Sequence, residues 1–156
     1  MSCGEFKMIA LPGDSYLSRK GDLLVPAEAV YEIYRPVDSP ERVNVNGRNL
    51  IPFGSTGRFG MLLVDVDSGV VVEKLEGRSD LGFVNTSLES FNSCLEAFCR
   101  RFPLSEIADE EEAEERDEEI AGQIEEEVRR IDPHAYREGS FWYEVRWSVA
   151  IGDFRD

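Results

Sequence analysis

The chain has one histidine and three cysteines, and this scarcity limits the chemistry that it can perform. The histidine is His134, which stands beside a proline in a segment expected to connect two helices. Without another histidine, no Ser-His or Cys-His pair for nucleophilic catalysis can be assembled elsewhere. An odd number of cysteines argues against a disulfide framework. Cys94 and Cys99 are five apart on an expected helix, so they point to different faces and cannot share a metal ion. We therefore expect no catalytic residue, no metal site and no cofactor.

The sequence also lacks a long hydrophobic run. No segment approaches the roughly 20 apolar residues that span a bilayer, and the first residues do not form a signal peptide. A length of 156 residues fits a single domain over 1–156 that can bury a core without disulfides. These features predict a cytoplasmic protein that makes no contact with a membrane.

Positive charge is scarce too: 17 lysines and arginines stand against 32 acidic residues, a net charge of −15. The imbalance is local, because residues 105–127 hold 13 acidic residues and one arginine, a charge of −12. The rest of the chain, with 19 acidic and 16 basic residues, carries only −3. Such a segment repels nucleic acid and anionic lipid and attracts a basic partner. The alternative interpretation is a solvated helix face that binds nothing.

The clearest helix pattern lies between Gly82 and Pro103. Five apolar residues recur there at spacings of three and four, which places them on one face of a helix. Thr86 is the expected N-cap, with Glu89 completing a capping box, and Pro103 ends the helix. With three phenylalanines on one face, this segment is predicted to be a core helix packed on a sheet. The five apolar residues are Leu88, Phe91, Leu95, Phe98 and Phe102.

Before this helix the sequence favours short strands. Asn46-Gly47 is a strong signal for a tight hairpin turn. Pro52–Gly60 is a glycine-rich loop in this interpretation, but it is not a phosphate loop, because a strand rather than a Lys-Ser/Thr pair and a helix follows it. Asp65-x-Asp67 resembles the start of a calcium loop, but the glycine that should follow is out of place, so these aspartates are assigned to a turn. The runs expected to form strands are 23–25, 30–34, 43–45, 50–51, 61–66 and 70–75.

Two further helices are expected after the core helix. The first, the acidic helix at about 105–131, has an apolar stripe only in its second half, so its first half is expected to be solvated, projecting or frayed. Asp132-Pro133 ends it, and a last helix covers about 140–150. Strands precede helices without sustained alternation, which predicts an α+β fold with a mostly antiparallel sheet.

Three stretches carry a family resemblance. A hairpin of the form LLVDVDSGVVV leads to FVNTSLESFNSCLEAF, and an acidic helix then leads to IDPHAYREGSFWYEV. In this order they resemble the SUKH superfamily of bacterial immunity proteins, most closely its fourth group. The turn around Leu11-Pro12 is similar to the Leu-Pro turn of that family. The motif positions are Phe83, Asn85, Ser87, Leu88 and Phe91 in the first part and Asp132, Pro133, Ala135, Phe141 and Trp142 in the second.

The resemblance implies a central, mostly antiparallel sheet with flanking helices. It implies a non-catalytic role, in which the protein binds and neutralises a polymorphic toxin used in contact-dependent competition between bacteria. Toxins of such pairs typically act on nucleic acids, as nucleases or deaminases. The resemblance carries over no catalytic residues, and the motif residues are expected to be structural. A regulatory scaffold of the same fold is the alternative, and a carboxylate- or metal-dependent hydrolase is a more distant one.

The predicted partner is a basic toxin domain, met by acidic and aromatic side chains, without direct binding of nucleic acid. Trp142 is assigned to the core and left out of this surface. The sequence leaves open whether the protein is a monomer or a homodimer. The expected partner-binding residues are Glu110, Glu111, Glu112, Glu114, Glu115, Asp117, Glu118, Tyr136, Tyr143 and Trp147.

Overall fold

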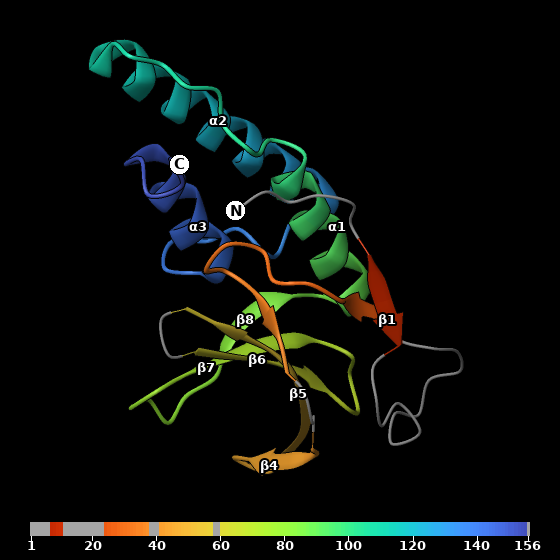
Figure 1. Ribbon diagram of the computed structural model, residues 1–156. Coiled ribbons are helices and arrows are strands. Elements are labelled where there is room, and N and C mark those ends of the chain that lie inside the picture. Colours follow the sequence, from red (N-terminus) through yellow and green to blue (C-terminus); the bar gives the residue numbers. More distant parts are fainter. Residues whose placement is uncertain (1–6, 11–23, 38–40, 58–59, 156) are drawn as a thin grey trace.

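The computed structural model describes residues 7–10, 24–37, 41–57 and 60–155. It confirms the predicted α+β class, with three helices on one side of a mainly antiparallel sheet (Figure 1). The strands are β1 (Met8–Ala10), β2 (Leu24–Pro26), β3 (Arg35–Pro36), β4 (Val43–Val45), β5 (Arg48–Thr56), β6 (Gly60–Asp65), β7 (Val71–Leu75) and β8 (Gly82–Asn85). The helices are α1 (Leu88–Cys99), α2 (Glu110–Ile131) and α3 (Phe141–Ala150).

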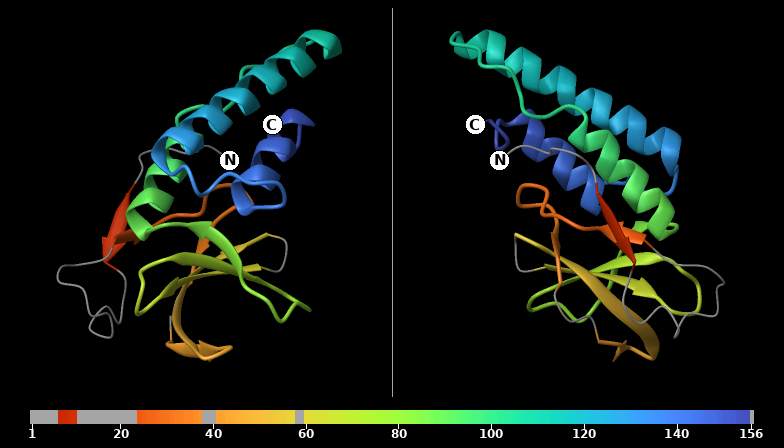
Figure 2. Two further views of the ribbon diagram at one scale, coloured as in Figure 1. Left: turned by 180° about the vertical axis from the view of Figure 1, so that it is seen from behind. Right: turned by 45° about the vertical axis from the view of Figure 1, so that its right-hand side comes forward.

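The main sheet has six strands in the order β3-β5-β6-β7-β8, with β4 also paired to β5. All of these pairs are antiparallel. A separate pair, β1 and β2, lies beside α1, and the amide of Asn92 on α1 donates to the Leu24 carbonyl at 2.7 Å. The two views of Figure 2 show α1 and α3 next to the sheet and α2 lying over these two helices, with β4 on the opposite side of the molecule.

The predicted core helix is the centre of the hydrophobic core. The Phe91 ring of α1 lies 5.5 Å from Phe53 of β5 and 6.0 Å from Trp142 of α3, measured between ring centroids. One to two turns further along α1, Phe98 stacks on Phe102 at 4.4 Å. Phe154, close to the end of the chain, packs edge-on against Phe98 at 5.3 Å. Because burial of aromatic rings supplies much of the stability of a small domain, these contacts fix both ends of α1 against the rest of the fold.

The hairpin predictions are confirmed, but the glycine-rich loop is not. Asn46 and Gly47 have φ values of 53° and 81°, the left-handed conformation that a two-residue turn requires. Residues 52–56, predicted to be a loop, are instead the second half of β5 and pair with β6 across a bulge between Pro52 and Gly54. The glycine at 54 serves close packing rather than a ligand, since a Cβ there would lie 2.5 Å from a ring carbon of Tyr34.

Other boundaries also differ from the predictions, and α1 ends at Cys99, before Phe102 and Pro103. The run 30–34 is a turn closed by one bridge between Val30 and Tyr34, with Tyr31 at a φ of 47°. The N-cap of α1 is Ser87, whose side chain exchanges hydrogen bonds with Ser90. Helix α2 begins at Glu110 rather than at 105. The predicted Leu11-Pro12 turn lies outside the described residues.

Candidate functional site

The family-motif residues form a buried polar network that joins β8 and the three helices. Asp132, the C-cap of α2, accepts hydrogen bonds from the Thr86 amide at 2.7 Å, the Thr86 hydroxyl at 2.8 Å and the Asn85 amide group at 3.0 Å. The Ser90 hydroxyl and the His134 amide also donate to it. Burial works to raise the pKa of Asp132, but the hydrogen bonds from Thr86, Asn85 and Ser90 outweigh this effect and hold the pKa below its usual value.

Asn85 extends the network to the last helix. Its side-chain oxygen accepts from the indole N–H of Trp142 at 2.8 Å, and both side chains are fully buried. A buried polar network whose members are all hydrogen-bonded fixes a unique packing of the elements it joins. This cluster therefore has a structural role. It also removes Thr86 from the helix cap, because the Thr86 hydroxyl is bound to Asp132.

The side chain of His134 is exposed, and its backbone amide serves the Asp132 network. Within the described part of the chain, no group of three or more His, Cys, Asp or Glu side chains is placed to hold a metal ion. Among the described helices, none is long and apolar enough to cross a bilayer.

The acidic residues predicted to bind a partner lie on the first half of α2. Of these, Glu111, Glu112, Glu114 and Glu115 are exposed, and none of the ion pairs found in the described residues involves them. Glu110 and Glu118 are also exposed but paired: Glu110 accepts from Arg155 at 2.9 Å and Glu118 from Arg146 at 2.6 Å. Four glutamates thus present unpaired charge to solvent.

Asp117 was predicted to belong to this surface, and its burial corrects that prediction. Its side chain is fully buried and bound by two arginines, Arg116 at 2.9 Å and Arg155 at 2.6 Å. Arg116 also donates to the backbone and hydroxyl of Ser105, which holds the chain before α2 alongside the helix. The first half of α2 projects away from the sheet, as predicted (Figure 2). It is not frayed, because ion pairs from Arg155 anchor it.

The three aromatic candidates lie in a row along one side of α3, but only Trp147 among them is exposed. Centroid distances are 5.7 Å from Tyr136 to Tyr143 and 6.2 Å from Tyr143 to Trp147. Tyr136 was predicted to be exposed, but it is buried, with the Arg129 guanidinium 4.5 Å above its ring. Burial and a hydrogen bond to Glu125 raise its pKa to about 12. Tyr143 is half-buried.

Trp147 is the exposed member of this row, at 44% of its surface. The Arg146 guanidinium lies 4.3 Å from the centre of its ring and is itself held by Glu118 and Glu125, so the ring is supported from one side. Ile151, one turn further along, is 73% exposed and was missed by the sequence analysis. Its spacing of four from Trp147, outside the buried stripe of α3, is the signal that would have indicated it. We call Glu111, Glu112, Glu114, Glu115, Trp147 and Ile151 the α2–α3 face.

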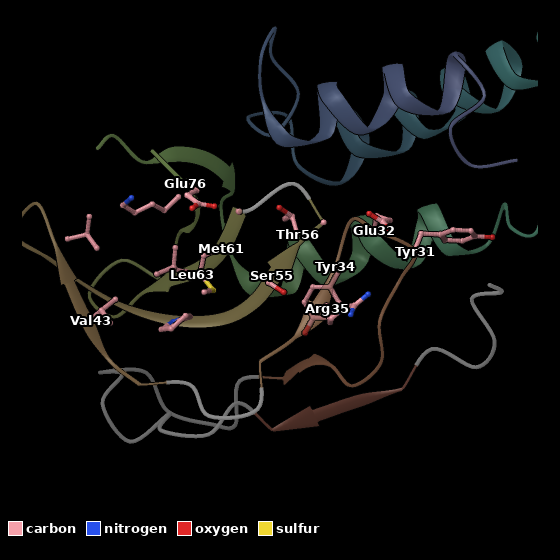
Figure 3. A pocket seen from close by; sticks show the side chains of 15 residues that line it. Tyr31, Glu32, Tyr34, Arg35, Val43, Ser55, Thr56, Met61, Leu63 and Glu76 are labelled. Carbon is pink, nitrogen blue, oxygen red and sulfur yellow. The ribbon is translucent and has the colours of Figure 1, made fainter. Parts of the chain in front are cut away.

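The uncovered side of the sheet holds a second candidate, a groove of about 820 Å³ (Figure 3). Val43, Met61 and Leu63 provide its apolar wall. Its charged lining is mixed, with Glu32 and Glu76 balanced by basic residues of β3 and β7. Such a groove has no charge preference, so it does not select between acidic and basic partners.

Comparison with known proteins identifies the family. A model of the SUKH-4 immunity protein family matches residues 24–147, which cover every described element from β2 to most of α3. Comparisons with curated proteins and with solved structures give no match. The match covers well over half of the chain and includes both motif regions, so the chain belongs to the SUKH-4 immunity protein family.

Proposed function

We propose that this protein protects a bacterial cell by binding and neutralising a polymorphic toxin whose active domain acts on nucleic acids or nucleotides, as a nuclease or a deaminase. Membership of the SUKH-4 immunity protein family supports the immunity role. The observation that carries the mode of action is the α2–α3 face, which combines four unpaired glutamates on α2 with an exposed tryptophan and an exposed isoleucine on or directly after α3. The Arg146–Glu118 ion pair joins these two helices.

Enzymes that bind nucleic acid have basic substrate grooves, because phosphate contacts supply much of their affinity. The glutamates of α2 would compete for such a groove and speed the encounter with it, since complementary charge raises association rates. Charge contributes less to tight binding than buried aromatic anchors do. Trp147, already supported by Arg146, is the anchor in this proposal, and Ile151 extends the apolar contact.

In this proposal the protein works by occupying its partner and performs no catalysis of its own. Its site of action is the cytoplasm of the producing cell, where a toxin of nucleic acids would do harm. A regulatory scaffold of the same fold would use a protein partner as well, and it is distinguished by the absence of protection against any toxin.

The decisive experiment co-expresses this protein with the toxin domain encoded by the neighbouring gene. Survival of cells that make both proteins, and death of cells that make the toxin domain alone, is the expected result. Equal killing with and without this protein would exclude the immunity role. The purified pair should form a complex whose dissociation constant rises steeply between 50 and 200 mM salt, by about tenfold or more.

A charge-neutralised variant then tests the acidic part of this surface. Replacing Glu111, Glu112, Glu114 and Glu115 by glutamine removes four unpaired charges and leaves the ion pairs of Glu110 and Glu118 intact. We expect slower association and a weaker salt dependence. The matched control replaces four exposed acids elsewhere, Asp80, Glu89, Glu126 and Glu138, by their amides, which lowers the net charge equally. If both variants bind alike, the acidic part of the α2–α3 face is not in the interface.

A further inference from the structure

A cleft of about 920 Å³ lies between the sheet and α3, on the side of α3 that faces away from α2. Strand β7 and the turn before β3 form one wall, and α3 with the end of the chain forms the other. Its lining has an apolar part, which gives the cleft a surface for packing as well as polar groups. The apolar side chains are Ile33, Leu75, Phe141, Val145 and Phe154.

Carboxylates from both walls face into this cleft. Glu73 comes from β7 and Glu144 from α3, and the lining also contains Glu32, Glu76 and Asp153. Within the described residues, the side chains of these four glutamates take part in none of the hydrogen bonds or ion pairs observed, and Arg78, the arginine of this lining, forms no ion pair with them. The Thr56 hydroxyl oxygen, in the same lining, is buried and has no hydrogen-bond partner.

Of these four glutamates, Glu73 has the surroundings that least favour an ionised carboxylate. It is partly buried, and burial together with the nearby charge of Glu144 raises its pKa. A carboxylate that has lost water without gaining a donor destabilises the fold when it is ionised. A cation placed between Glu73 and Glu144 would be attracted by both carboxylates and would stabilise their ionised forms. The sheet groove of Figure 3 differs in its balance of charge, because Arg35 and Lys74 match its two glutamates. Among the described residues of its lining, the cleft has one basic residue, Arg78, for five carboxylates.

We propose that this cleft is a docking site for an arginine side chain presented by the protein that the α2–α3 face binds. The proposal rests on the proposed function for the identity of that partner. A guanidinium has donors in one plane that can reach two carboxylates at once, and its flat faces pack on aromatic rings, which Phe141 and Phe154 supply here. The cleft adjoins the α2–α3 face, since Glu144 and Trp147 are three residues apart on the exposed side of α3.

The cleft can be tested without any toxin. The full chain, labelled with ¹³C, is titrated with N-acetyl-arginine amide while the side-chain carboxyl signals of its glutamates are followed by NMR. The expected result is a saturable shift of the Glu73 and Glu144 signals, with a fall in the apparent pKa of Glu73. N-acetyl-citrulline amide has nearly the same shape without the charge and should cause no shift, and N-acetyl-lysine amide should bind more weakly.

Two results would overturn the proposal. One is the absence of a saturable shift at Glu73 and Glu144. The other is an equal shift at exposed glutamates such as Glu111 and Glu114, which would mean unspecific attraction of a cation. The variant Glu73→Gln keeps the size of the side chain and should abolish the response at Glu144.

The complex with the toxin domain provides the second arm. Glu73→Gln and Glu144→Gln should each weaken binding by about tenfold, as loss of a buried charge partner does, whereas the exposed control Glu89→Gln should bind normally. Normal binding by both cleft variants would exclude the arginine site and leave the immunity function standing. If the unaltered protein gives no protection, the immunity function is wrong, and the titration with arginine amide still decides whether the cleft takes a guanidinium.

Discussion

Asp132 and Glu73 are two carboxylates removed from bulk water, and the protein treats them in opposite ways. Asp132 at the end of α2 accepts hydrogen bonds from four different residues and has a lowered pKa. Glu73 on β7 faces another glutamate, has no donor among the described residues, and has a raised pKa. The first arrangement stabilises the fold, whereas the second destabilises it when Glu73 is ionised.

This difference distinguishes a carboxylate that stabilises the fold, Asp132, from one proposed to bind a partner, Glu73. A satisfied buried carboxylate is part of the scaffold, because its removal leaves donors without partners. A carboxylate without hydrogen-bond donors in an open cleft can instead bind a partner, because a cation of that partner replaces the water that the carboxylate has lost. The following changes test whether that contrast holds.

The largest effect is expected for Asp132→Ala. Removing the carboxylate strands the buried amide group of Asn85 and the Thr86 backbone amide, so the free energy of unfolding should fall by about 3–5 kcal/mol. Urea denaturation followed by circular dichroism measures it. Asp132→Asn keeps one acceptor oxygen and should lose distinctly less. A loss below about 1 kcal/mol for the alanine variant would mean that the network is dispensable and that the contrast with Glu73 is false.

For Asp117→Ala we expect a loss of stability smaller than that for Asp132→Ala. Asp117 is fully buried and paired with Arg116 and Arg155, but both arginines retain other partners, Ser105 and Glu110 respectively. We expect a loss of about 2 kcal/mol, the scale of a hydrogen bond to a charged group. Hydrogen exchange should rise in the first half of α2 and stay unchanged in its second half. Uniform exchange along the helix would contradict the ion-pair anchor.

The sequence predicts the fold class and the helices well because their signals are local. Four of the five apolar residues at helical spacing lie in α1, and Asn46-Gly47 forms the β4–β5 turn. Both signals can be read from the sequence without reference to distant residues. The N-cap of α1 was misassigned because two neighbouring residues could both serve. The choice between Thr86 and Ser87 is made by Asp132, which lies 46 residues after Thr86 in the chain and binds its hydroxyl.

The same reason explains the errors in the candidate site. Asp117 lies in a run of glutamates and looks identical to them in sequence, but Arg155, 38 residues later, folds back to bind it. Tyr136 was grouped with exposed aromatic residues near the acidic segment, but Arg129 and Glu125 of α2 cover it. Exposure of Trp147, by contrast, follows from its position outside the apolar stripe of α3, and that local signal gave the correct answer.

Trp147→Ala separates binding from stability on the surface that adjoins the Glu73 cleft. Because the ring is 44% exposed, the free energy of unfolding should change by less than about 1 kcal/mol. Affinity for the neutralised toxin domain should fall by about 2 kcal/mol, or roughly thirtyfold, as expected for an aromatic anchor. Leu24→Ala, at 46% exposure on β2, is the matched control and should bind normally. Equal affinity of both variants would exclude Trp147 as an anchor.

The smallest effect is the most direct test of the contrast, because its sign differs between the two carboxylates. Asp132 has a folded-state pKa below its ordinary 3.8, so its stabilising contribution is complete above that value and is lost as the pH falls toward the folded-state pKa. Glu73 has a folded-state pKa above its ordinary 4.5, so it destabilises the fold above the raised pKa and has no such effect below the ordinary one. Glu73→Gln should therefore be more stable than the unaltered protein at pH 7, by about 0.5 kcal/mol, and the gain should vanish by about pH 4. Asp132→Asn should show the reverse, with a deficit at pH 7 that shrinks as the pH falls. Urea denaturation of all three proteins from pH 3 to 8 measures both differences, and parallel curves for the two variants would show that these carboxylates do not differ as proposed.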